Sequence, residues 1–178
     1  MAASEFALEA RARRSYELGR LRWALRSAPL VLAAGTAAVA CGRPFALTCI
    51  LTFALLGLTV AFSFRGGSAS RAVTPGLAAG SLALAMPLLM ATLGHACFGP
   101  ACLKLGLPAC IFGGALAGLV IARSAVRAHP GIGFLAAAVA VGALAGSLGC
   151  TMAGAAGVFG MLAGAVLAGA PVLVVARR

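Results

Sequence analysis

The chain has 178 residues, of which 62% are hydrophobic and only 10% are charged. A soluble domain carries about 25% charged residues, so this composition excludes an ordinary soluble globular protein. The formal net charge is +11. Because the arginines flank long apolar runs, we attribute this charge to membrane orientation and expect no direct binding of nucleic acid.

The first 26 residues form a polar, mostly basic segment whose leucines recur at helical spacing. We expect two regions: a cytoplasmic amphipathic segment over 1–26 and a membrane bundle over 27–178. The segment could bind a cytosolic partner, or it could serve only to fix topology and contact anionic lipid. Its candidate partner-binding residues are Tyr16, Leu18, Leu21, Arg13 and Arg14.

Six apolar runs follow, each able to cross a hydrocarbon core of about 30 Å as a helix, the short first one with help from snorkelling arginines. The predicted spans are Ser27–Cys41, Pro44–Phe64, Ala72–Gly94, Leu105–Ala122, Ile132–Cys150 and Ala155–Ala176. We expect a Gly/Ser-rich loop over Arg65–Arg71 and a basic loop over Arg123–Gly131. The predicted fold is therefore an all-α, polytopic, six-span helical bundle.

Six spans put both termini on the same side of the membrane. Of the 14 Lys and Arg residues, only Arg43 and Lys104 then fall on the opposite side. Short loops rich in Lys and Arg stay in the cytosol. We therefore predict that both termini are cytoplasmic and that the protein crosses the bacterial inner membrane several times.

Pairs of glycines four residues apart recur within the predicted spans. They are Gly76–Gly80, Gly114–Gly118, Gly142–Gly146 and Gly160–Gly164. Small residues at this spacing let helix backbones approach closely. We favour packing within the chain, and the alternative is a homo-oligomer that forms through these faces. The third and fifth spans carry few large side chains, so we expect them to be inner helices.

Under this topology all six cysteines lie in the outer half of the protein. Three interpretations remain open for Cys41, Cys97, Cys102 and Cys150: a structural disulfide, a redox- or metal-responsive thiol pair, or small buried residues without a role. Thiolate and imidazole groups suit soft or borderline ions such as Cu(I) and Zn²⁺. A soft metal ion could accordingly bind His95, Cys97 and Cys102, which lie close together in the sequence.

The acidic residues are Glu5, Glu9 and Glu17, all before the first span, and the chain contains no Asp. No carboxylate–histidine or Ser–His–Asp arrangement can therefore form within the membrane, and we expect no enzyme. Coupled transport usually needs an ionisable residue at depth, which argues against an ion-driven transporter.

The layout of a short cytosolic N-terminus followed by six spans resembles the NrsF-like membrane anti-sigma factors. The resemblance is best over Cys102–Cys150, which is similar to that family's fourth span, basic loop and Gly/Ala-rich fifth span. Cys150 stands in Gly149–Gly154, without the His, Pro and acidic residue that accompany the family's cysteine. The resemblance implies that Cys102 and Cys150 form a sensing pair and that the N-terminal segment holds an extracytoplasmic-function sigma factor.

The leading hypothesis is thus an inner-membrane anti-sigma factor that releases its partner in response to an outer-face redox or metal signal. The alternative is a small membrane carrier or tolerance protein for a soft metal or another small solute.

Overall fold

The computed structural model describes residues 15–19, 21–22, 24–40, 44–94, 100–128, 131–150 and 154–176. All regular structure in these ranges is helical, which confirms the all-α class. The elements are a 3₁₀ turn η1 (Leu25–Ser27) and the helices α2 (Ala28–Ala40), α3 (Phe45–Arg65), α4 (Gly67–Gly94), α5 (Pro100–Ala128), α6 (Ile132–Cys150) and α7 (Gly154–Val175).

In the described part of the chain, four stretches are long and apolar enough to cross a membrane. They are Phe45–Arg65, Gly106–Ala128, Ile132–Cys150 and Gly154–Val175, and Leu25–Ala40 is a shorter apolar helix. Their outward-facing side chains are also apolar, with Ile132 83% and Leu167 74% exposed. A large apolar outer surface is unfavourable in water and favourable in lipid. The protein is therefore a helical membrane protein.

The α3 helix has its polar side inward. Thr48, Thr52 and Thr59 are buried, whereas Phe45 is 71% and Phe53 is 66% exposed. The buried hydroxyls are satisfied within their own helix: Thr52 Oγ1 donates to the Thr48 carbonyl at 2.7 Å, and Thr59 Oγ1 donates to the Leu56 carbonyl at 2.9 Å. Buried hydroxyls cost little when they bond to the backbone in this way, so they need no water or ligand.

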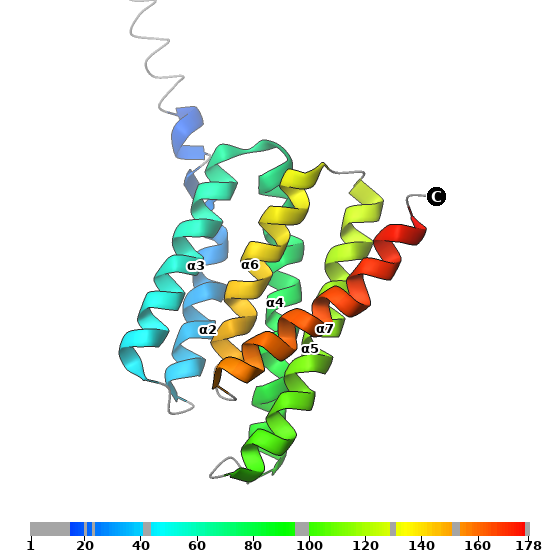
Figure 1. Ribbon diagram of the computed structural model, residues 1–178. Helices are drawn as coiled ribbons and strands as arrows, with labels where there is room; N and C mark the ends of the chain where they lie inside the picture. Colours follow the sequence, from blue (N-terminus) through cyan, green and yellow to red (C-terminus); the bar gives the residue numbers. More distant parts are fainter. Residues whose placement is uncertain are drawn as a thin grey trace, which may run out of the picture.

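The helices α2 to α7 run alternately up and down the bundle, with α4 and α6 in its middle (Figure 1). The hairpin of α2 and α3 lies on one side of this middle layer, and α5 and α7 lie on the other. α6 packs mainly on α4, and α7 packs mainly on α5. The central position of α4 and α6 agrees with the prediction of two inner helices poor in large side chains.

Glycines bring α4 and α6 together as parallel helices. A Cβ atom built on Gly76 would lie 2.9 Å from the Ala138 carbonyl oxygen, and one built on Gly149 would lie 2.9 Å from Leu84 Cα. Residue numbers rise together along both helices, so the helices point the same way. Since real Cβ atoms are not found so close to backbone, only glycine permits this approach.

The α5 and α7 helices pair in the same way. A Cβ on Gly160 would lie 3.1 Å from Ile111 Cγ1, and one on Gly169 would lie 3.0 Å from the Gly118 carbonyl oxygen. Between these points, a Cβ on Gly118 or Gly164 would overlap the backbone of the facing helix. These contacts lie within the chain, which confirms the predicted intramolecular use of the glycine pairs.

The predicted Gly/Ser-rich loop at Arg65–Arg71 and the predicted basic loop at Arg123–Gly131 are both longer than the connections in the structure. α3 and α4 are separated at Gly66 and Gly67, which have φ values of 75° and 66°, and Ser68–Arg71 is already helical. Two residues with positive φ suffice for this break, because glycine adopts that conformation without steric cost. Similarly, α5 continues to Ala128, so Arg123 and Arg127 lie on a helix.

We predict that Gly118→Ala destabilises the bundle. The new methyl group would overlap the backbone of Ala165, so α5 and α7 must separate, at a cost of about 1–3 kcal/mol. The midpoint of thermal unfolding in neutral detergent should fall by several degrees.

Gly57→Ala on α3 is the matched control, because a Cβ there meets nothing within 4 Å. It should leave the midpoint unchanged or raise it slightly, since alanine favours helix. Equal midpoints for both variants and the parent would contradict the close α5–α7 contact.

Candidate functional site

Four helices meet in one buried layer in the middle of the bundle. A Cβ built on Gly113 of α5 would lie 3.2 Å from Ala83 Cα of α4, and one on Gly146 of α6 would lie 3.0 Å from Ala83 Cβ. Met161 of α7 closes the layer, with its sulfur against Gly146 and its backbone against Gly114. The thioether thus lies against α6, whereas the Met161 backbone lies against α5.

Two thiols follow this layer, one helical turn further toward the end of the bundle where α5 begins and α6 ends. Cys110 stands four residues before Gly114, and Cys150 stands four residues after Gly146. Both side chains are fully buried, and both belong to the same core cluster as Met161. We call Cys110, Cys150 and Met161 the sulfur cluster. Any change in the bulk or chemistry of its thiols must disturb the contacts between helices, because close-packed cores tolerate little change in volume.

Cys110 was not among the predicted sensing residues, which included Cys150 and Cys102. A signal for it exists in the sequence: Cys110, Gly114 and Gly118 are each four apart, and so are Gly142, Gly146 and Cys150. Residues four apart share one helix face. Each cysteine therefore extends a glycine stripe. The α5 stripe packs against α7 and the α6 stripe packs against α4, and these close contacts bury both thiols.

The other predicted site residues are described only in part. Cys102 lies near the start of α5, where the structure describes the backbone. Tyr16 is 66%, Leu18 is 60% and Leu21 is 41% exposed, on a segment that projects from the end of the bundle (Figure 1). The predicted residues that lie outside the described ranges are Arg13, Arg14, Cys41, His95 and Cys97.

The predicted metal site therefore stays a prediction. Within the described ranges, no three His, Cys, Asp or Glu side chains gather into a group that could hold a metal ion. Two of the three predicted ligands, His95 and Cys97, are beyond those ranges, and the third, Cys102, is described by its backbone.

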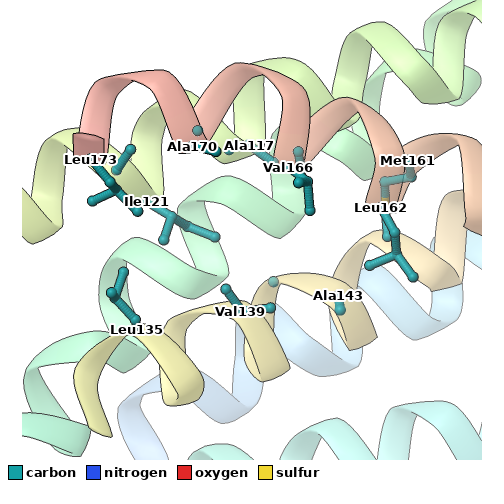
Figure 2. Close-up of a pocket in the computed structure, with 15 residues that line it drawn as sticks. Ala117, Ile121, Leu135, Val139, Ala143, Met161, Leu162, Val166, Ala170 and Leu173 are labelled. Atoms are coloured by element: carbon teal, nitrogen blue, oxygen red, sulfur yellow. The ribbon is translucent and has the colours of Figure 1, made fainter. Parts of the chain in front are cut away.

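A groove of about 220 Å³ opens between α6 and α7, above the face of α5. Figure 2 shows Val139 of α6 opposite Val166 of α7, with Ile121 of α5 between Leu135 of α6 and Leu173 of α7. Every lining residue is Ala, Gly, Val, Leu, Ile or Met. Without a side chain that forms strong hydrogen bonds, the groove is suited to apolar groups.

A scan against protein-family models, a search of the curated proteins and a search of the solved structures each found no match.

We predict a large difference in thiol reactivity between Cys49 and Cys150. Two full-length variants would each keep one of these cysteines and replace the other five by alanine. Cys49 is half-buried on α3, whereas Cys150 is fully buried. A small maleimide in detergent should modify Cys49 at least about tenfold faster, because a buried thiol reacts only after local opening.

Circular dichroism and gel filtration of both variants are the controls for folding. If Cys150 reacted as fast as Cys49 in a folded variant, the sulfur cluster would not be closed to reagents.

Proposed function

We propose that the protein is an inner-membrane anti-sigma factor with six spans and both termini in the cytosol. It holds an extracytoplasmic-function sigma factor at its cytosolic face and releases it when outer-half thiols are oxidised or bind a soft metal. The protein acts by binding and not as an enzyme. The alternating directions of α2 to α7 support the topology, because Arg65, Arg71, Arg123 and Arg127 all gather at one end of the bundle.

The exposed apolar N-terminal segment is the observation that carries the proposal. Tyr16, Leu18 and Leu21 are all exposed, on a segment outside the bundle and at its arginine-rich end. Exposed apolar side chains between charged residues are typical of a protein-binding segment. Membrane contact would satisfy the same side chains, so binding of a partner has to be measured directly.

A packed route connects this segment to the sulfur cluster. The N-terminal segment leads through η1 into α2. Val31 of α2 belongs to one buried cluster with Val141 and Leu148 of α6, and Leu148 is two residues before Cys150. A change in packing around Cys150 would shift α6 against α2, and the shift would reach the segment that we propose binds the sigma factor.

A carrier for a soft metal has less support. The groove between α6 and α7 has only apolar lining, and the buried hydroxyls of Thr52 and Thr59 bond to their own helix. A metal carrier needs ligands along its path. Under the predicted topology, no cysteine lies in the half of the protein that faces the cytosol. Uptake of Cu(I) or Zn²⁺ into proteoliposomes would favour the carrier.

We predict that Leu18→Ser/Leu21→Ser abolishes capture of the sigma factor by the full-length, detergent-solubilised protein. Loss of two apolar anchors should weaken binding by at least about tenfold. Co-purification from cells of the source bacterium, with sigma factors identified by mass spectrometry, measures the effect. The matched control is Val174→Ser/Val175→Ser, which removes exposed apolar residues at the same end of the bundle and should leave capture unchanged.

Addition of an oxidant or a soft metal salt to the captured complex tests the proposed signal. Release from the parent, and none from Cys102→Ser/Cys150→Ser, is the expected outcome. Equal release from both would discard the thiol mechanism and leave the anti-sigma role standing. Failure to recover any sigma factor with the parent protein would remove the anti-sigma role itself.

A further inference from the structure

The α5 and α7 helices separate at the arginine-rich end of the bundle and leave an open cleft. The last close contact that involves a glycine is between Gly118 and Gly169, and α7 crosses α5 obliquely (Figure 1). Beyond this contact lies a cleft of about 540 Å³. It is lined by Arg123, Val126, Arg127, Pro171, Val172, Val175 and Ala176.

The crossing explains why the cleft exists. Parallel helices that pack through glycines commonly cross at about 40°, so each 5.4 Å turn beyond the contact separates the axes by roughly 3–4 Å. The valines at these positions are too small to fill the widening space. Val126 is 38% and Val175 is 73% exposed as a result.

The cleft carries two positive charges that the bundle does not neutralise. Arg123 and Arg127 are four residues apart on one face of α5, and both are exposed. No Asp or Glu follows Glu17 in the sequence, and Glu17 lies on the N-terminal segment at the far side of the bundle from α5 and α7 (Figure 1). Among the described residues, therefore, no carboxylate side chain lies beside these guanidinium groups, and a bound anion would supply the missing negative charge.

The chemistry of the lining selects the class of ligand. Guanidinium groups form strong paired hydrogen bonds with phosphate, whereas Val126, Pro171, Val172 and Val175 offer only apolar contact. A free phosphate would leave those apolar walls exposed. An anionic phospholipid uses both parts, and the helix end places the arginines where lipid headgroups lie.

We propose that this cleft binds one anionic phospholipid. The phosphate accepts hydrogen bonds from Arg123 and Arg127, and an acyl chain lies against Val126 and Val172. This site is separate from the sulfur cluster and from the N-terminal segment, so it does not depend on the anti-sigma role.

Native mass spectrometry of the full-length protein in neutral detergent tests the site. The protein is mixed with equal amounts of phosphatidylglycerol and phosphatidylcholine of the same chain length. One phosphatidylglycerol should be retained per chain, in preference to phosphatidylcholine. Arg123→Gln/Arg127→Gln should reduce this retention by at least about tenfold, because two charge-assisted contacts are lost.

Arg65→Gln/Arg71→Gln is the matched control, since it removes the same charge at the same end of the bundle and should leave retention unchanged. Val175→Trp fills the cleft at an exposed position, keeps both arginines, and should also reduce retention. Circular dichroism verifies that each variant is folded.

Three results would overturn the proposal. The first is an equal loss of phosphatidylglycerol retention in the Arg123/Arg127 and Arg65/Arg71 variants, and the second is equal retention of both lipids by the parent. The third is displacement of the lipid by millimolar glycerol phosphate, which would indicate a site for a free phosphate.

Discussion

Direct contact between the backbones of parallel helices at glycine is the interaction on which the rest of this structure depends. Inside a bilayer, apolar side chains gain little by leaving lipid for protein, so close packing has to hold the helices together. Gly76 and Gly149 bring α4 and α6 together, and Gly118 and Gly164 do the same for α5 and α7. The bundle is therefore two parallel pairs joined through α4 and α5, with the α2–α3 hairpin packed against the first pair.

Both candidate sites follow from these crossings. Where the glycine stripes continue into cysteine, at Cys110 and Cys150, the close approach buries the thiols among four helices. Where the α5–α7 crossing runs past Gly169, the helices diverge and leave a cleft beside Arg123 and Arg127. Cys110 and Met161 of the sulfur cluster belong to the same α5–α7 pair whose far end forms the cleft, so a change of crossing angle would affect both.

Local features of this fold could be predicted from the sequence, whereas the pairing of helices could not. The span Ile132–Cys150 was predicted with the bounds that α6 has, because apolar length and flanking turn residues are local signals. Gly/Ser content overestimated the loop at Arg65–Arg71, since Gly66 and Gly67 alone suffice for the turn. Glycine spacing indicates that a backbone can be approached but not which helix approaches it. Cys110 was missed for the same reason. The glycine stripe that it extends can be recognised in the sequence, but the helices that bury its thiol cannot.

Disulfide crosslinking between α5 and α7 in native membranes tests the parallel pairing most directly. A Cβ on Gly160 would lie 3.1 Å from Ile111 Cγ1, so Ile111→Cys/Gly160→Cys in a background without other cysteines places two thiols within bonding reach. The account predicts rapid crosslinking of this pair by a mild oxidant and none for Ile111→Cys/Val174→Cys. An antiparallel arrangement would bring position 111 toward the far end of α7. Crosslinking of the second pair and not of the first would therefore contradict the account.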